Sequence, residues 1–415
     1  MTVQKQQLDM YWDDGSKVGM YSGAIKGMGR TATTTYVGHA FKFVDPGSKE
    51  LVARLVMRSD TTMYIIEPEE SDATTLDSAE YKRVKAEAKW YADYYQKHGI
   101  PWLSVHNRPR PELNMWPAER LGQVHRVTSR AGYWQEGDGP GGASLAKGVL
   151  GSMLWGVTGS AVGSRGGPAV TDNLEEPQRA NRRTLSKVDG PHHQSTAPVE
   201  LNMTVVSKGP EGPRVFLVEN LLSDFECDHI VREGSKVVRP SIVGQDGGFK
   251  SRTRTSENGW LSRQRTPVLD TVHRRMADVL GLHDSMVRSG ANAEELQVVR
   301  YEPGQQYQPH HDFSDAGVVH QRFLTLLLYI YPPQKGGYTS FPKAHDGRGL
   351  RVKPPKGSGV LFYSMLPDGN GDDLSLHAGE PVLEGRKWVC NLWIWDPIRY
   401  VSLCYVRYFK LCSRD

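Results

Sequence analysis

The segment YEPGQQYQPHHDF, residues Tyr301–Phe313, decides what this chain folds into and what it can bind. It contains His310 and Asp312, two positions apart. On a strand, residues i and i+2 project from the same face, so both side chains can reach one metal ion. His311 points to the opposite face and is the weaker candidate. The segment therefore predicts a strand that carries two ligands of a metal site.

A metal held by these two side chains needs a third ligand from elsewhere in the chain. The candidate is His377, in the segment SLHAG. Two histidines and one carboxylate on one face of an octahedron suit Fe(II) and leave three positions open. A 2-oxo acid fills two of these positions and dioxygen takes the third. The distal carboxylate of 2-oxoglutarate needs a cation, and Lys387 on the following strand would supply it as a point charge.

The sequence around these candidates predicts helices followed by many short strands. RVFLVENLLSDFECDHIVREGSKV favours a strand, a turn and a helix that begins after Ser223, a good N-cap. A second helix is expected over Pro267–Leu280. Helices before strands indicate an α+β, mostly β fold: a double-stranded β-helix, or jelly roll, with supporting helices. The expected strands lie in ELQVVRYE, RFLTLLLYIY, LRVKPPKGSGVLFYSM, LHAGEPVLEG and KWVCNLWIWD.

Residues 203–398 resemble the catalytic domain of the prolyl 4-hydroxylase family. The matching pieces are YEPGQQYQPHHD, RFLTLLLYI, GGYTSFP, KGSGVLFYSMLPDGNGDDLSLHAG and GRKWVCNLWI. RTRTSENGWL, residues 252–261, is similar to the family's substrate-side segment. The resemblance implies a procollagen-proline 4-dioxygenase-like enzyme that acts on a proline-containing peptide or protein and releases succinate and CO2. It also implies Fe(II), 2-oxoglutarate, O2 and L-ascorbate as cofactors.

The resemblance assigns roles to single residues. His310, Asp312 and His377 match the iron ligands, and Lys387 matches the lysine that binds 2-oxoglutarate. Further matches line the cofactor pocket (Tyr301, Thr339 and Trp393) or lie near the substrate proline (Tyr307 and Arg322).

One position departs from the family pattern. The family has Trp-Ile-His near the end of the domain, and this chain has Trp393-Ile394-Trp395. The missing histidine lies near the substrate in the family, so the peptide preference stays open. Two alternatives follow: hydroxylation of another substrate, or an inactive module that binds proline or hydroxyproline peptides. The complete ligand set and Lys387 oppose the inactive module.

Residues 8–70 predict a small β-sandwich-like domain. Within it TTYVGHAF, residues 34–41, resembles the β-domain of the von Hippel–Lindau protein, which binds hydroxyproline peptides. Thr35 and His39 match polar positions of that pocket, and Phe41 stands where the family has tryptophan. The resemblance implies a peptide pocket that would retain hydroxylated product; the alternative is a plain sandwich without peptide binding.

The remaining stretches divide into three. Residues 76–130 predict a helical segment, with an amphipathic helix from Ser78 to His98 that Gly99 closes. Residues 131–200 are rich in Gly, Ser and charge and predict a linker. Residues 399–415 form a C-terminal tail, either an edge strand or a disordered end.

Composition places the chain among ordinary globular proteins. Of its 415 residues 38% are hydrophobic and 24% charged, and a net charge of +4 gives no nucleic-acid signal. The uncharged stretch 148–164 is shorter than the roughly 20 apolar residues of a membrane span, so a loop is favoured. No signal peptide is visible, which favours a cytoplasmic over an endoplasmic reticulum location.

Overall fold

The computed structural model describes most of the chain in several ranges. These are residues 6–103 (except 28, 30, 32–34, 36, 62 and 69), 110–136, 192–243, 249–250, 255–288, 291–313 and 320–396. Two compact units result, unit 1 from residues 1–108 with 314–319, and unit 2 from the rest. No helix in the described ranges combines the length and the apolarity that crossing a bilayer requires.

Three of the sequence expectations fall wholly or largely outside the described residues. They are the stretch 148–164, the tail 399–415 and most of the expected linker 131–200. The described ends of that linker hold two short strands, β6 (Trp134–Glu136) and β7 (His192–Gln194), which pair with each other.

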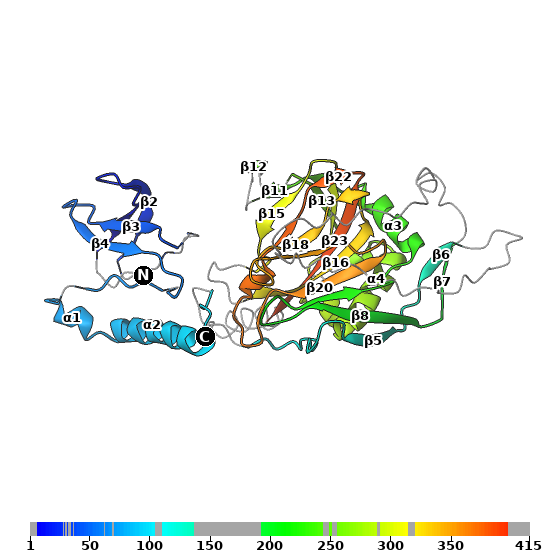
Figure 1. The fold of residues 1–415 in the computed structure, drawn as a ribbon, viewed down its shortest axis with the longest axis horizontal. Helices are drawn as coiled ribbons and strands as arrows, with labels where there is room; N and C mark the ends of the chain where they lie inside the picture. The colour runs from blue at the N-terminus through cyan, green and yellow to red at the C-terminus, as the bar shows by residue number, and fades with distance from the viewer. Residues whose placement is uncertain are drawn as a thin grey trace, which may run out of the picture. The chain divides into compact units, whose positions relative to one another are not determined.

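Unit 1 contains a single four-stranded antiparallel sheet (Figure 1). Its strands are β1 (Leu8–Trp12), β2 (Met20–Ile25), β3 (Ala40–Val44) and β4 (Leu51–Val56), in the order β2-β1-β3-β4. The register pairs Met10 with Phe43, so alternate residues of β1 and β3 share one buried face. In the described part of residues 8–70 the four strands form one sheet with one packed face, and a second sheet of the expected sandwich is not among them.

The long helix of unit 1 has the bounds that its sequence indicates. After the short α1 (Ala73–Leu76), α2 spans Ala79–His98. The Ser78 side chain accepts a hydrogen bond from the Tyr81 backbone N–H, and Gly99 ends the helix in the left-handed conformation that glycine adopts at low cost. The expected helical segment 76–130 does not continue beyond this point, since residues 124–129 form a strand of unit 2.

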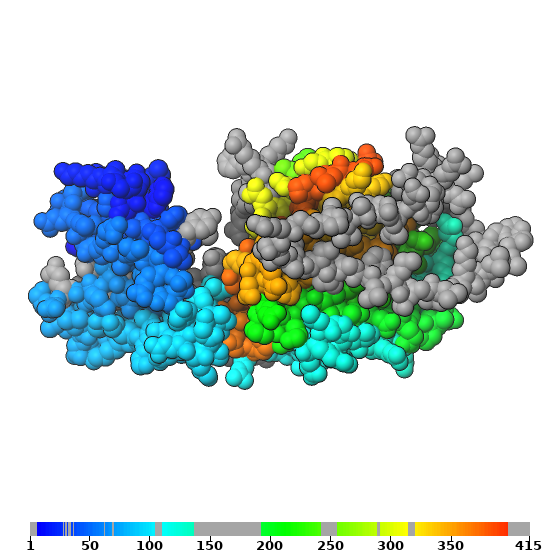
Figure 2. All heavy atoms as spheres, in the orientation of Figure 1, coloured from blue at the N-terminus to red at the C-terminus, as the bar shows by residue number. Residues whose placement is uncertain are grey.

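Unit 2 is organised by a nine-stranded antiparallel sheet, the large sheet (Figure 1). In chain order its strands are β5 (Val124–Ser129), β8 (Val199–Ser207), β9 (Val215–Val218), β10 (Arg239–Pro240), β13 (Glu257–Leu261), β14 (Leu296–Tyr301), β16 (Gln321–Tyr331), β20 (Ser358–Tyr363) and β23 (Lys387–Asp396). Their spatial order is β10-β13-β14-β23-β16-β20-β9-β8-β5. The dioxygenase-like fold thus starts before residue 203, because β5 and β8 belong to its sheet. Figure 2 shows the residues around β5 at the surface, beside the green elements that follow them in the fold.

A second, four-stranded sheet faces the large one. It consists of β15 (Tyr307–His310), β21 (His377–Gly379), β18 (Thr339–Phe341) and β19 (Leu350–Val352), in that spatial order. One buried cluster joins the two sheets, with Leu327 and Tyr329 from β16 and Phe341 from β18. This pair of facing antiparallel sheets confirms the expected double-stranded β-helix. The smaller elements are β11 (Ile242–Val243), β12 (Phe249–Lys250), β17 (Lys335–Gly336), β22 (Val382–Glu384), η1 (Arg263–Arg265), η2 (Asp284–Val287) and η3 (Asp373–Ser375).

Two helices cover the other face of the large sheet. They are α3 (Asp224–Gly234), with Ser223 as its N-cap, and α4 (Pro267–Leu280), with proline in its first turn. Because side chains of a strand alternate, Leu326 and Leu328 of β16 face the helices while Leu327 and Tyr329 face the second sheet. Both helices predicted from the sequence are confirmed.

A buried ion pair ties these two helices to each other and to the chain that follows β5. Arg275 of α4 and Glu226 of α3 are both fully buried and form two hydrogen bonds, of 2.7 and 2.9 Å. Arg275 also donates to the backbone carbonyls of Ala131, Gly132 and Leu221. All five guanidinium N–H groups therefore have acceptors, which is the condition for burying the charge.

We expect Arg275→Met to lower the free energy of unfolding by about 3–5 kcal/mol, because it leaves a buried carboxylate without its counter-charge. The neighbouring Arg274 provides the matched control. It makes an exposed ion pair with Asp270, so Arg274→Met should cost at most about 1 kcal/mol. Urea unfolding followed by circular dichroism measures both variants. Equal effects of the two substitutions would contradict a structural role for the buried pair.

Candidate metal centre

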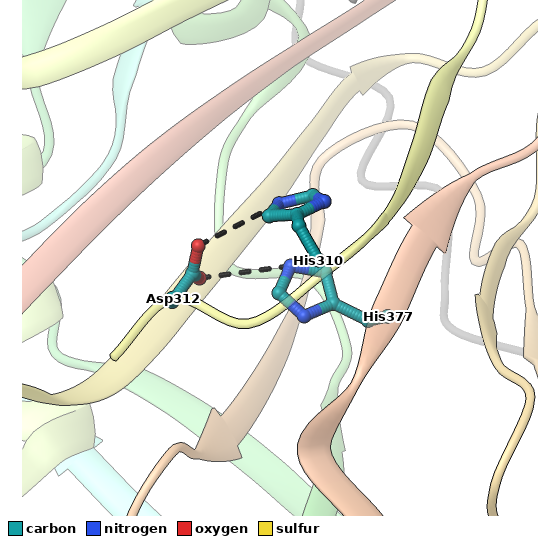
Figure 3. A group of neighbouring side chains, drawn as sticks. All are labelled: His310, Asp312 and His377. Atoms are coloured by element: carbon teal, nitrogen blue, oxygen red, sulfur yellow. Dashed lines mark ion pairs between the residues drawn. The ribbon is translucent and has the colours of Figure 1, made fainter. Parts of the chain in front are cut away.

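The two candidate histidines meet because their strands are neighbours. His310 ends β15, His377 begins β21, and the antiparallel register places them directly opposite each other. Their ring centroids are 4.4 Å apart. Asp312 follows β15 after a bend, and its carboxylate lies 3.7 Å from His310 Nε2 and 3.6 Å from His377 Nε2. Figure 3 shows both imidazoles turned toward that carboxylate.

The backbone orients both imidazole rings. His310 Nδ1 lies 2.9 Å from the Gln308 carbonyl oxygen and His377 Nδ1 lies 3.0 Å from the Ser375 carbonyl oxygen. A carbonyl can only accept, so each Nδ1 donates to it and carries a proton. The ring nitrogen left for a metal is Nε2, which in both imidazoles lies toward Asp312.

Asp312 is held as a carboxylate within the protein. Its side chain is 4% exposed, and burial alone would raise its pKa. The nearby His377, His310 and Arg322 and a hydrogen bond from Thr325 outweigh burial, so the pKa of Asp312 lies below its usual value. Thr325 Oγ1 and Trp393 Nε1 both donate to Oδ2, at 2.6 and 3.0 Å. These two bonds fix the plane of the carboxylate.

The three ligand atoms form a compact donor set. Two imidazole nitrogens and one carboxylate oxygen lie within 4.8 Å of one another, and among the described residues this is the one such cluster. His311 takes no part in it. Its ring lies 4.6 Å from that of Phe313, and its Nε2 lies 3.2 Å from the Asp373 carbonyl oxygen. The donor set therefore fits a ferrous ion and leaves other coordination positions to small ligands.

The donor set lines a pocket with a volume of about 150 Å³ between the two sheets. Every residue that the sequence predicted for the catalytic site lines this one pocket. The predicted residues other than the metal ligands are Tyr301, Thr339, Trp393, Lys387, Tyr307 and Arg322.

Lys387 is a buried cation in this pocket. It is 2% exposed, and its Nζ lies 5.5 Å from the ring centroid of Tyr301 and 5.1 Å from that of Tyr329. Burial lowers the pKa of Lys387 to about 7; Glu380 acts in the opposite direction and Lys353 adds to the effect. Among the described residues no carboxylate lies within ion-pair distance of it, so the pocket offers an anion a charge partner.

Two residues at the site escaped the sequence analysis. Thr325 donates to Asp312, and the Tyr329 hydroxyl lies 2.7 Å from the hydroxyl of Thr339. Both stand in RFLTLLLYIY, an apolar run that indicates only a buried strand. The alternation of side chains along a strand could have revealed both residues. Residues 325, 327 and 329 share the pocket side of β16, and two of these three carry hydroxyl groups.

The two residues predicted to contact the substrate, Tyr307 and Arg322, both lie beside the metal site. The Tyr307 ring stacks on that of His310, with centroids 3.6 Å apart. The Arg322 guanidinium lies 3.7 Å from the centroid of the Trp393 ring and forms two hydrogen bonds with Glu294, at 2.6 and 3.0 Å. Both side chains thus touch a residue of the metal site or of its hydrogen-bond shell.

Of the three residues predicted for a peptide pocket in unit 1, two are in contact with each other and the third lies in the core. Thr35 Oγ1 lies 3.1 Å from His39 Nδ1, and the His39 ring lies 5.7 Å from that of Trp12. Phe41 is 6% exposed and belongs to the core of the sheet. The structure therefore places Thr35 next to His39, and it places Phe41 on the packed face of β3.

Comparison with known proteins gives a consistent result. Residues 296–395 match the model of the 2OG-Fe(II) oxygenase superfamily. Probable prolyl 4-hydroxylase 4 of Arabidopsis thaliana is 32% identical over 224 residues, which cover 48% of this chain and 73% of the relative. Prolyl 4-hydroxylase 1 of the same plant is 37% identical over 200 residues, which cover 44% and 69%. A solved viral collagen prolyl hydroxylase from Paramecium bursaria Chlorella virus-1, in complex with 2OG, is 30% identical, with a TM-score of 0.36 and coverage of 45% and 97%.

We expect Thr325→Val to weaken Fe(II) binding by about 10- to 100-fold, because it removes one of the two donors that orient Asp312. Anaerobic titration with Fe(II) measures the affinity. Thr128→Val is the matched control, since Thr128 donates to Glu200 on β8, away from the pocket. Unchanged affinity in the Thr325 variant would show that Trp393 suffices to hold the carboxylate.

We expect 2-oxoglutarate to bind more weakly as the pH rises above about 7. The pKa of Lys387 is lowered to about 7, so above this pH the free protein holds a neutral lysine and binding must take up a proton. The affinity then falls by on the order of tenfold per pH unit. Anaerobic calorimetry at pH 8, in buffers of different ionisation enthalpy, measures the uptake. Lys387→Met should show no uptake and little binding; a wild-type affinity independent of pH between 7 and 9 would refute the assignment.

Proposed function

This chain belongs to the prolyl 4-hydroxylase family of 2-oxoglutarate–Fe(II) oxygenases, and from this premise we propose that it hydroxylates a prolyl residue of a peptide or protein. The reaction would consume O2 and convert 2-oxoglutarate into succinate and CO2. The observation that carries the proposal is one pocket that holds two imidazoles and a carboxylate beside a buried lysine.

We propose that His310, Asp312 and His377 bind the Fe(II). The three side chains are already in place, and each imidazole offers Nε2 as the ligand atom for the metal. The negative charge of Asp312 suits a divalent cation, and Thr325 and Trp393 hold the carboxylate in one orientation. When bound, iron supplies the redox chemistry that activates O2, which no protein side chain offers.

Lys387 would bind the distal carboxylate of 2-oxoglutarate. Its ammonium lies over two tyrosine rings rather than beside an acidic side chain, so an incoming dicarboxylate provides its ion pair. The Thr339 hydroxyl, held by Tyr329, lines the same pocket and is the second group proposed for the cofactor. Gly379 also lines it, where an added Cβ would come 3.4 Å from the Tyr301 hydroxyl oxygen. A side chain at position 379 would therefore narrow the pocket.

The substrate side of the pocket is formed by Tyr307 and Arg322. We propose that these two side chains position the prolyl residue above the metal ligands. The apolar side chains of Leu327, Val389 and Phe362 also line the pocket and limit the access of water to the reacting groups. L-ascorbate is the proposed reductant that keeps the iron ferrous between turnovers.

The direct test is turnover of the purified chain with Fe(II), 2-oxoglutarate and ascorbate. Succinate release is measured with and without proline-rich peptides, and mass spectrometry looks for the gain of one oxygen atom at proline. Succinate without a peptide product would point to another substrate. Absence of both, in a folded protein that binds iron, would favour a binding module and refute the proposal.

We expect His377→Ala to lose iron binding and all turnover, because it removes one of the three ligands. His311→Ala is the matched control: it changes the histidine next to His310 and should still take up one Fe(II). Thermal unfolding of both variants separates loss of the ligand from loss of the fold. Wild-type succinate release by the His377 variant would contradict the assignment of this ligand.

A further inference from the structure

Three side chains form a connected group in which Arg322 lines the pocket, while Trp395 and Glu294 have no part in the proposed chemistry. Trp395 Nε1 donates to Glu294 Oε1 at 2.8 Å, and Arg322 donates to both oxygens of Glu294. We call Trp395, Glu294 and Arg322 the arginine cluster. Arg322 in turn stacks on Trp393, the side chain that donates to Asp312. The arginine cluster therefore contacts the metal site through the indole of Trp393.

The sheet brings the cluster together. Arg322 of β16 is paired in register with Trp395 of β23, and the backbone N–H of Glu294 donates to the Trp393 carbonyl oxygen. The side chains of Arg322 and Glu294 are 26% and 15% exposed, so this ion pair is only partly solvated. Two parallel hydrogen bonds fix the guanidinium in one plane, which is the geometry that arginine forms best with a carboxylate.

The cluster carries no net charge. The positive charge of Arg322 is compensated by Glu294, and Trp395 contributes a neutral N–H donor. An indole N–H stays neutral at every pH, whereas an imidazole at the same position would gain a positive charge at mildly acidic pH. Tryptophan at position 395 therefore satisfies Glu294 without adding a charge to the substrate side of the pocket.

The surface next to the cluster is aromatic. Trp260 of β13 is 40% exposed, and its ring centroid lies 6.0 Å from that of Trp393. Trp260 pairs in register with Gln297, and Gln297 with Asn391, and the latter two line the pocket, so Trp260 lies on the same side of the large sheet. The exposed indole of Trp260 beside an uncharged cluster favours an apolar, extended peptide segment.

We propose that Trp395 is a specificity-determining residue, which through Glu294 holds Arg322 in a fixed and charge-compensated position and so selects peptides with uncharged residues next to the target proline. The inference rests on the proposed prolyl hydroxylation. Trp395 and Glu294 act as positioning residues, because they reach the substrate through Arg322. The 2-oxoglutarate side of the pocket, at Lys387, is untouched by the cluster.

The test compares Trp395→Phe and Glu294→Gln with the wild type on three peptides. The peptides share one target proline and carry Ala, Glu or Lys next to it. Glu294→Gln leaves the charge of Arg322 uncompensated, so kcat/KM for the Glu peptide relative to the Ala peptide should rise about two- to fivefold, the size of one partly exposed ion pair. The Lys peptide should fall by a similar factor.

Trp395→Phe should move the same ratios in the same direction, by a smaller factor, because Glu294 keeps its charge but loses the donor that holds it in place against Arg322. The KM for 2-oxoglutarate should stay unchanged in both variants, which a general loss of structure would not allow. Trp388→Phe is the matched control. Trp388 lies on the same strand, and its indole packs against Arg300 in a cation–π contact at 5.6 Å.

Two outcomes count against the inference and can be told apart. If the wild type hydroxylates the peptides but both variants keep its Glu/Ala and Lys/Ala ratios, as Trp388→Phe does, the selectivity does not come from the cluster. If the wild type hydroxylates none of the peptides, the proposed function fails and the inference falls with it. Thermal unfolding confirms the fold of each variant; should one fail to fold, the ratios of the other decide.

Discussion

The pairing of β15 with β21 sets His310 opposite His377, and the rest of the site depends on this register. Side chains alternate along a strand, so a slip of one residue would turn an imidazole away from the pocket. The two strands belong to the smaller sheet, while the donors that hold Asp312 come from β16 and β23 of the large sheet. The two histidines therefore meet within the smaller sheet, but the carboxylate of Asp312 is oriented only when the two sheets have packed, so the complete site depends on the whole fold.

Two buried charges divide the pocket into functional halves. Asp312 is surrounded by imidazoles and hydrogen-bond donors, which keep it ionised in spite of burial. The Lys387 ammonium lies near the rings of Tyr301 and Tyr329, and its burial lowers its pKa to about 7. One half of the pocket suits a cation and the other half suits an anion. A dicarboxylate bound as proposed would supply the negative charge that Lys387 needs.

Much of the fold and of the site could be predicted from patterns that extend over a few residues. The rest depends on pairing between segments that are far apart in the sequence. The spacing of His310 and Asp312, and the N-cap Ser223 of α3, act over a few residues and were predictable. The place of β5 was not, since it pairs with β8, some seventy positions later in the chain, and neither segment names its partner. Thr325 was hidden for a different reason: a hydroxyl inside a run of leucines has the composition of a core strand. In unit 1 the sequence pattern predicts strands but does not tell how many sheets they form. The four strands there form one sheet.

Because β5 lies at the edge of the large sheet, the point at which the chain is cut decides whether the catalytic fold keeps its sheet complete when it is moved into another protein. The resemblance read from the sequence begins near residue 203, inside β8, yet the large sheet is completed by a strand from residues 124–129. A fragment cut at residue 203 would lose part of β8 together with β5, and would present an unsatisfied row of backbone groups that invites association with other chains. A gene fusion made at that residue would carry the metal ligands without the edge of the large sheet. The structural unit of this fold is therefore larger than residues 203–398.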